Sequence, residues 1–252
     1  MIIDTHVHLQ LCEQDPATLI ANAKAANVTK LINVGTYLES SQSNLDLANR
    51  FPGIVYPTAG IHPCYKDAYN QLDALTTLVK TNTFHAIGEC GFDFHYPDSA
   101  PADQQETVFR AQLDLARNTN LPVIIHTRKA DPHLKPVLDE YSDVRKVIHC
   151  YGGSWDFTQT LLSNTTWFSF TGQITFAKKG KPIRTLNHIP LEKIMIETDA
   201  PYLTPKAFKG QKNEPAFVPE IAKKIAAIKN ISLDTVIATT TKTATDFFNL
   251  DA

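Results

Sequence analysis

The chain has 252 residues, of which 43% are hydrophobic and 20% are charged, and its formal net charge is −2 at pH 7. This composition is typical of a globular protein with a sizeable core, and it argues against a protein that wraps nucleic acid through an overall basic surface. No apolar run is long enough to span a membrane, and the N-terminus lacks a signal-peptide pattern. The four cysteines show no C-x-x-C spacing, so free thiols and the missing signal pattern predict a cytoplasmic protein.

The chain opens on a strand-like stretch, residues 2–9, in which apolar and polar residues alternate. A period of two places Asp4, His6 and His8 on one strand face and Ile3, Thr5 and Val7 on the other. Two imidazoles two residues apart can bind one ion, because a neutral ring nitrogen is a ligand for Zn, Mn, Fe or Ni. A His-x-His by itself is more often an ordinary pair of strand residues, so the rest of the chain has to supply further ligands.

Strand-like and helix-like segments then alternate along the whole chain. Short apolar segments typical of buried strands cover residues 30–35, 54–62, 84–91, 122–126, 146–150, 167–171 and 193–199. Helices or irregular crossovers follow them, from a first helix at Asp15-Pro16 and a later one from Ser154 to two closing helices through residues 221–228 and 236–248.

This alternation predicts a parallel sheet that is buried on both faces. Eight such units favour an α/β fold of the (β/α)8 TIM-like barrel type over an open doubly wound sheet. We expect one domain over residues 1–252. No Gly-rich phosphate loop follows the first strand, which argues against a nucleotide cofactor.

Ionisable side chains recur at the ends of the later strands. Four of them end an apolar strand segment: Glu89, His126, His149 and Asp199. In a barrel these strand ends meet at the mouth, where active sites lie. Because ionisable groups that are buried without partners are costly, their convergence with His6 and His8 predicts six metal ligands around one cavity.

The period of two also predicts which residues share a face with the ligands. Glu89 is expected on the same face as Ile87. Cys90 and Cys150 directly follow a proposed ligand, so both thiols are expected on the opposite face as small packing residues.

Six ligands exceed the needs of one tetrahedral ion and fit two divalent ions, Mg, Mn or Zn, that are bridged by a carboxylate. The predicted arrangement has Glu89 as the bridge, His6, His8 and Asp199 around one ion, and His126 and His149 on the other. A hydroxide between the ions would be the nucleophile and Asp199 the general base, so Glu89 and Asp199 are the predicted catalytic residues. Glu197 and Asp4 are expected to orient ligating histidines, with barrel-interior polar packing as the alternative.

Two ions bridged by a carboxylate can clamp both the attacking and the leaving oxygen of a phosphoryl displacement, and a phosphodiester substrate would need donors around its oxygens. Arg128, two residues past His126, and His62, at the end of the third strand, are the predicted phosphate contacts. Lysines within residues 178–181 and 206–212 follow the last two strands and could form a basic rim for a single strand. Six aromatic residues in the same loops are candidates for base stacking: Phe92, Phe94, Tyr96, Tyr151, Phe176 and Tyr202. The alternative for the charged residues is ordinary solvated surface, and the alternative for the aromatic residues is packing in the core.

Taken together, these motifs resemble the TatD family of metal-dependent deoxyribonucleases, within the wider amidohydrolase-like barrels. The matching segments are spread over nearly the whole chain and cover residues 3–8, 60–63, 88–93, 122–128, 149–154, 197–203 and 213–215. The resemblance implies a TIM-like barrel, a divalent-metal site and hydrolysis of DNA phosphodiesters, often from a 3′ end. Departures from the family pattern are at Gln10, Asp131-Pro132, Tyr151-Gly152 and Lys242; they avoid every proposed ligand and bear on substrate choice.

The leading hypothesis is a metal-dependent exonuclease that acts on single-stranded DNA as a monomer, without a membrane or a nucleotide cofactor. The alternative is an amidohydrolase-like or tRNA-ester hydrolase that uses the same dinuclear site. Both reactions need the same hydroxide, so the ligand set does not separate them, whereas the basic rim favours phosphate. A non-enzymatic barrel is disfavoured because all six ligands are present.

Overall fold

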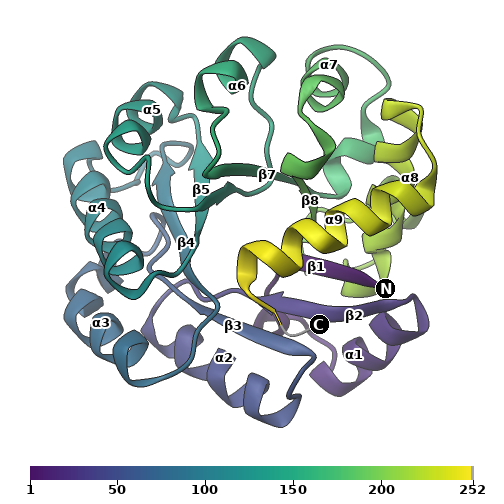
Figure 1. Cartoon of the computed structure of the whole chain (residues 1–252). Helices are drawn as coiled ribbons and strands as arrows, with labels where there is room; N and C mark the ends of the chain where they lie inside the picture. Colours follow the sequence, from purple (N-terminus) through teal and green to yellow (C-terminus); the bar gives the residue numbers. More distant parts are fainter. Residues whose placement is uncertain (251–252) are drawn as a thin grey trace.

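The computed structural model describes residues 1–250 and shows eight parallel strands in chain order around a nearly closed barrel (Figure 1). The strands are β1 Ile2–Val7, β2 Val28–Asn33, β3 Val55–Ala59, β4 Ala86–Asp93, β5 Val123–Arg128, β6 Lys146–Ile148, β7 Thr166–Phe170 and β8 Ile194–Ile196. Each strand pairs with its neighbours in sequence, which is the order that right-handed crossovers give when every crossover lies on the same face of the sheet. The predicted (β/α)8 barrel is confirmed.

Helices alternate with the strands and cover the outer face of the sheet (Figure 1). They are α1 Pro16–Ala25, α2 Leu38–Arg50, α3 Leu72–Thr81, α4 Ala102–Thr119, α5 Asp131–Glu140, α6 Trp155–Leu161, α7 Lys181–His188, α8 Val218–Lys229 and α9 Leu233–Phe248. The two predicted helix starts carry N-caps, since Asp15 accepts from the backbone of Ala17 and Ser154 from that of Phe157. Within residues 1–250, no helix combines the length and the apolar composition that crossing a bilayer requires.

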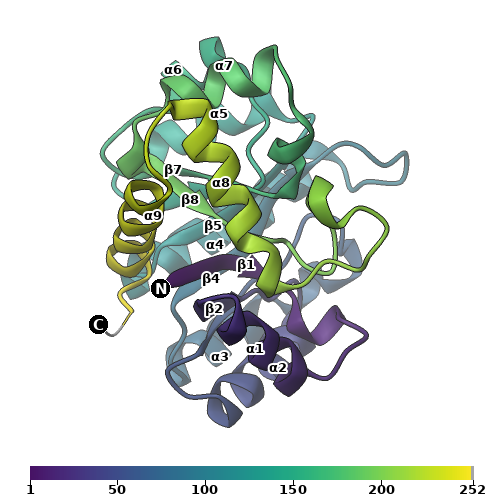
Figure 2. The same ribbon diagram turned by 90° about the vertical axis from the view of Figure 1, so that its right-hand side faces the viewer.

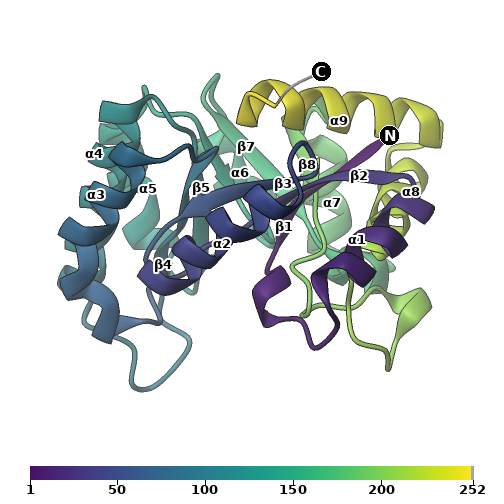
Figure 3. The ribbon, with the colours of Figure 1, turned by 90° about the horizontal axis from the view of Figure 1, so that it is seen from below.

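Two apolar clusters hold the barrel together. The larger lies between the sheet and the surrounding helices. The smaller lies inside the barrel and consists of Ile3, Ile32, Val34, Tyr56, Ala86, Ile124, Val147 and Met195 with Ala244, Phe247, Phe248 and Leu250. Helix α9 therefore covers the end of the barrel at which the strands begin (Figure 3). The N-terminus lies beside it (Figure 2), where the Thr241 hydroxyl donates to the carbonyl of Met1 at 3.0 Å.

The side-chain alternation of β1 differs from the prediction. Asp4 lies opposite Leu31 and Val7 opposite Asn33, so three steps along β1 match two along β2. Such a shift accommodates one extra residue and interrupts the period of two. As a result Ile3 packs inside the barrel and Val7 packs outside it, although both were expected on one face.

A similar shift occurs in β4. Ile87 pairs with Val123 and Cys90 with Ile125, so again three steps match two. Ile87 and Cys90 both belong to the outer cluster, whereas Glu89 faces into the barrel. The expectation that Glu89 shares a face with Ile87 was wrong, because a period of two cannot anticipate an extra residue.

Two glycines let β4 run close to β5. Gly88 and Gly91 have φ values of 139° and 140°, a region that favours glycine. A Cβ at Gly88 would lie 2.6 Å from a carbonyl oxygen of β5, and one at Gly91 would overlap another. The strand continues to Asp93, so Glu89 stands in the middle of its strand and not at its end.

The barrel closes between β1 and the segment after β8. The backbone N–H of Asp199 donates to the carbonyl of His6 at 2.8 Å, and that of His8 donates to Ala200 at 2.9 Å. Strand β8 ends at Ile196, earlier than predicted. Asp199 has a φ of 57°, a left-handed conformation that aspartate tolerates better than most residues.

The buried side chain of Asp4 links β1 to the segment after β8. The side-chain oxygens of Asp4 accept from the backbone N–H of Thr198 at 2.8 Å and from the Thr198 hydroxyl at 2.5 Å. It also accepts from the backbone N–H of His6 at 3.3 Å, so it positions His6 through the strand and not through the ring. Burial raises the pKa of Asp4 to about 8.

Replacing Phe247 by alanine should destabilise the fold without changing the open end of the barrel. Phe247 is 2% exposed within the inner cluster, and truncating such a side chain costs about 3–5 kcal/mol. Denaturant unfolding measures the loss, with Lys242→Gln, an exposed position on the same helix, as the matched control. A free energy of unfolding within about 0.5 kcal/mol of wild type would show that α9 does not close the barrel.

Candidate metal centre

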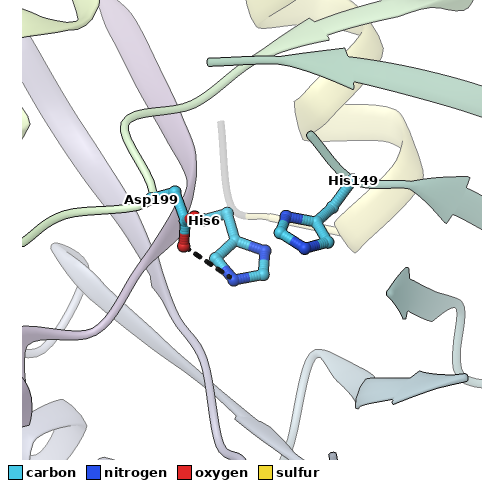
Figure 4. A group of neighbouring side chains, drawn as sticks. All are labelled: His6, His149 and Asp199. Atoms are coloured by element: carbon cyan, nitrogen blue, oxygen red, sulfur yellow. Dashed lines mark ion pairs between the residues drawn. The ribbon is translucent and has the colours of Figure 1, made fainter. Parts of the chain in front are cut away.

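Six side chains converge at the open end of the barrel. They come from β1, β4, β5 and the segments that follow β1, β6 and β8: His6, His8, Glu89, His126, His149 and Asp199. The rings of His6 and His149 stack with centroids 4.1 Å apart, and the Asp199 carboxylate faces His6 (Figure 4). The structure therefore brings together all six residues that were predicted as ligands.

One half of the cluster lies around the end of β1. The Nε2 atoms of His6 and His8 are 3.1 Å apart. Asp199 Oδ1 lies 3.6 and 3.5 Å from these two nitrogens. Glu89 Oε2 lies 3.4 and 3.8 Å from them.

The other half involves the second oxygen of Glu89. Glu89 Oε1 lies 2.8 Å from His126 Nδ1 and 2.7 Å from His149 Nε2. These two nitrogens are 3.3 Å apart. Glu89 thus faces both halves of the cluster, with one carboxylate oxygen toward each.

Three of the four histidines have an acceptor beside the ring nitrogen that points away from the cluster. The pairs are His8 Nδ1 with the Val34 carbonyl at 3.0 Å, His149 Nδ1 with Glu197 Oε1 at 3.4 Å, and His126 Nε2 with Asp93 Oδ2 at 3.0 Å. A proton on the outer nitrogen leaves a lone pair on the inner one, which is the form that binds a metal. Facing lone pairs at 3.1 and 3.3 Å repel unless a cation or a proton lies between them, so the donor set fits divalent ions.

Electrostatics favour an ionised carboxylate at the centre. Burial alone would raise the pKa of Glu89, but the charges of His149 and the neighbouring histidines lower it well below its usual range. Burial lowers the pKa of His6, whose Nδ1 has no hydrogen-bond partner among residues 1–250. Burial would likewise lower the pKa of His149, but the charges of Glu89 and Glu197 raise it well above its usual range, so metal binding there would displace a proton.

His62 lies beside the cluster, with Nε2 3.6 Å from Glu89 Oε1. Distance alone would allow it to join Glu89 and His126 around an ion. However, the backbone N–H of Cys64 donates to His62 Nδ1 at 3.0 Å, which places the proton of the neutral ring on Nε2. Burial lowers the pKa of His62 to about 3, so the ring is neutral. His62 therefore presents an N–H donor to the site.

The cluster forms the floor of a cavity of about 650 Å³. Arg128, the last residue of β5, lines this cavity, and its guanidinium carbon lies 5.7 Å from the centre of the Tyr96 ring. Cys150 lies past the end of β6 with a φ of 48° and also lines the cavity. The expectation that Cys150 packs on the outer face was wrong, whereas Cys90 does pack there.

The structure separates the aromatic residues that were predicted to stack on bases. Three are exposed: Tyr96 at 49%, Phe176 at 45% and Tyr202 at 54%. Phe92 and Tyr151 are buried, and Phe94 is half-buried against the outer cluster. Tyr65, which the sequence did not single out, is 41% exposed and lines the same cavity as Tyr96 and Tyr202.

The lysines of the two predicted rim groups, residues 178–181 and 206–212, are exposed at the open end of the barrel. Lys212 forms an ion pair with Glu13 at 2.8 Å, between the loops that follow β8 and β1. An exposed ion pair of this kind is weak, so Lys212 can exchange Glu13 for an anion.

Asp93 belongs to the site although the sequence did not single it out. Its carboxylate faces His126 Nε2 and accepts from the backbone N–H of His95 at 2.7 Å. The amide of Gln105 binds both backbone groups of Asp93, at 2.9 and 3.0 Å. The sequence did offer a signal for Asp93. It follows Glu89 by four residues on the same strand, and a period of two places residues four apart on the same face.

Known proteins share both the sequence and the fold. Residues 3–249 match a family model described as TatD related DNase. An uncharacterized metal-dependent hydrolase of Bacillus subtilis, YabD, is 33% identical over the full length of both chains. A 3′-5′ ssDNA/RNA exonuclease TatD of Edwardsiella piscicida is 36% identical over 94% of each chain. The solved structure of YJJV, a TatD homolog from Escherichia coli, matches with a TM-score of 0.90 at 25% identity, over 99% of this chain and 98% of its own.

Asp93→Asn should weaken metal binding by about 10- to 100-fold while the fold survives, because the amide is a weaker acceptor for the His126 N–H. Calorimetric titration of metal-free protein with Zn²⁺ or Mn²⁺ measures the change. Asp98→Asn, an exposed position on the same connection, is the matched control. Equal metal affinity in the Asp93 variant and wild type would show that Asp93 does not position His126.

Proposed function

The chain belongs to the family of TatD-related DNases and is a metal-dependent hydrolase, and on that premise we propose that it hydrolyses phosphodiester bonds of single-stranded DNA from the 3′ end. The resemblance seen in the sequence motifs is thereby confirmed at the level of the family. One observation carries the proposal: the histidine and carboxylate cluster forms the floor of a cavity whose wall includes Arg128 and exposed tyrosines.

We assign the cluster to two divalent ions, Mg, Mn or Zn. His6, His8 and Asp199 would hold one ion, His126 and His149 the other, and Glu89 would bridge them. The support for two ions is the division of the nitrogens into two close pairs, each beside its own oxygen of Glu89. When bound, such ions supply Lewis acidity that activates water and stabilises the charge developing on the phosphate.

Asp199 is the carboxylate best placed to take a proton from water. Its side chain is 14% exposed against 4% for Glu89, so it is the more accessible of the two. Burial would raise the pKa of Asp199, but the hydrogen bond to His8 and the charges of the nearby histidines lower it. The carboxylate is then ionised at neutral pH, as a general base must be.

His62 and Arg128 would hold phosphates of the strand, His62 beside the metal cluster and Arg128 farther out on the wall of the cavity. His62 presents a neutral N–H donor toward the cluster, so it can bind a non-bridging oxygen without competing for an ion. The Arg128 guanidinium offers a two-pronged contact that suits phosphate. The exposed rings of Tyr65, Tyr96 and Tyr202 would then stack on bases, as in other proteins that bind single strands.

The alternative substrate class is an amide or an ester, including a tRNA ester, cleaved by the same set of ligands. A small amide or ester would use the cluster but would gain nothing from an Arg128 fork, whereas a tRNA ester carries phosphates and would differ only in the bond that is cleaved. The aromatic and cationic wall therefore favours a nucleic-acid strand.

A nuclease assay on strands labelled at either end tests the proposal, with Mg²⁺, Mn²⁺ or Zn²⁺ added to metal-free protein. A 3′ label should be released at once, whereas a 5′ label should pass through a ladder of shortening strands. Glu89→Gln should lose metal binding and turnover together, since an amide cannot bridge two cations as a carboxylate does. A wild-type protein that cleaves amides or esters but no strand would favour the alternative, and a fully active Glu89→Gln would remove Glu89 from the mechanism.

Arg128→Ala should weaken binding of a short single strand and flatten its salt dependence. Each phosphate contact contributes about −0.7 to the slope of log K against log salt on a single strand, so the slope should change by roughly that amount. Hydrolysis of a small phosphodiester should stay close to wild type, because Arg128 lies on the wall of the cavity and not among the ligands.

Arg128→Lys is the matched variant and should restore only part of the affinity, because an ammonium cannot reproduce the guanidinium fork. The measurement is a salt titration of binding with wild type and both variants side by side. Equal slopes and equal affinities for all three proteins would show that Arg128 is a solvated residue with no phosphate contact.

A further inference from the structure

A second cavity lies at the same end of the barrel, between the beginnings of α6 and α7. Its volume is about 520 Å³. It is lined by Ser154, Trp155, Asp156, Gly180, Lys181, Arg184 and Thr185. Helices α6 and α7 stand side by side in Figures 1 and 2, and both begin where the strands end. The proposed hydrolysis makes no use of this cavity.

The second cavity is connected to the metal cluster by a short loop. Ser154 is five positions after His149, so their Cα atoms lie within about 18 Å of each other. The Thr185 hydroxyl donates to the carbonyl of Gly153 at 3.1 Å and thereby ties α7 to this loop. The backbone N–H of Cys150 donates to Glu197 at 2.7 Å at the other end of the loop. The two cavities therefore keep a defined spacing.

The lining combines an aromatic surface with two cations. Trp155 is half-buried and stacks on His188, with ring centroids 4.8 Å apart and planes 28° apart. Lys181 and Arg184 are exposed and three residues apart on α7, so their side chains leave the same face of the helix. An aromatic surface beside two cations is the combination that binds the base and the phosphate of one nucleotide.

One carboxylate lies among these groups without cancelling their charge. Asp156 Oδ1 is 3.9 Å from the Arg184 guanidinium, and the two side chains are 83% and 64% exposed. An exposed pair at this distance is worth little, so Arg184 can exchange it for a phosphate. The cavity retains a net positive charge from Lys181 and Arg184 against Asp156.

We propose that this second cavity is a subsite for a nucleotide several positions away from the scissile bond. The base of that nucleotide would stack on Trp155, and its phosphate would pair with Arg184 and Lys181. The proposal rests on the proposed action on single strands and specifies how the strand leaves the metal cluster. The upper limit of about 18 Å corresponds to at most about five nucleotides at about 3.4 Å per nucleotide. Strands of about six or more nucleotides should therefore reach the subsite.

Tryptophan fluorescence tests the subsite directly, because the chain contains only two tryptophans. Trp167 lies on β7 against Phe247 of α9, at the far end of the barrel, so it serves as an internal reference. Chelator-treated protein is titrated with an oligothymidylate octamer and with a dinucleotide. The octamer should quench the emission, the dinucleotide should not, and Trp155→Phe should abolish the quenching.

Removing the cations tests the phosphate contact. A variant that combines Lys181→Gln with Arg184→Gln, both at exposed positions, should bind the octamer about 10- to 100-fold more weakly and the dinucleotide as well as wild type does. Lys242→Gln, an exposed charge on α9, is the matched control and should bind both strands normally. Octamer binding by the double variant at wild-type affinity, or quenching that persists in Trp155→Phe, would overturn the subsite.

Hydrolysis of the same two strands separates this proposal from the proposed function. Wild type should have a higher kcat/KM for the octamer than for the dinucleotide, and the double variant should lose that preference. An unchanged preference in an active double variant would overturn the subsite while the nuclease activity stands. A wild type that hydrolyses neither strand would overturn the proposed function, and the fluorescence titration, which requires no turnover, would still decide the subsite.

Discussion

The position of Glu89 is the constraint on which the rest of the site depends. A carboxylate that is 3% exposed needs compensating partners, and ring nitrogens of His149, His126 and His6 lie 2.7, 2.8 and 3.4 Å from its oxygens. These histidines belong to three other parts of the barrel, so the barrel must close before the carboxylate is compensated. Closure of the barrel therefore forms the fold and also brings the histidines to Glu89. Bound metal ions would add further positive charge beside the Glu89 carboxylate.

The contacts that close the barrel also position the ligands. The backbone of Asp199 binds the carbonyl of His6, and Asp4 joins Thr198 to β1, which carries His6 and leads directly into His8. Buried hydrogen bonds of this kind allow little displacement, because leaving either partner unpaired is costly. The Asp199 carboxylate and the imidazoles of His6 and His8 are thus held in one arrangement before any ion binds.

One end of the barrel contributes to the stability of the fold, and the other end carries the residues proposed to bind substrate. Helix α9 closes one end with an apolar plug that includes Phe247. The other end carries the cluster, and its wall holds the exposed side chains of Arg128 and Tyr96. Because the wall residues contribute little to the core, they can vary without loss of the fold, and substrate choice is expected to depend on them.

The alternation of strands and helices was enough to predict the barrel, and charged or imidazole side chains near strand ends were enough to select the six residues that converge. Both follow from local periodicity, which the chain carries in its sequence. The face of Glu89 was decided by the register of β4 on β5, a pairing between distant segments that shifts the period by one residue. The backbone N–H of Cys64 determines which ring nitrogen of His62 carries the proton. The pairing of β4 with β5 brings Asp93 into contact with His126. Exposure of Tyr65 and burial of Phe92 depended on which loops cover which strands, so only the tertiary structure could distinguish them.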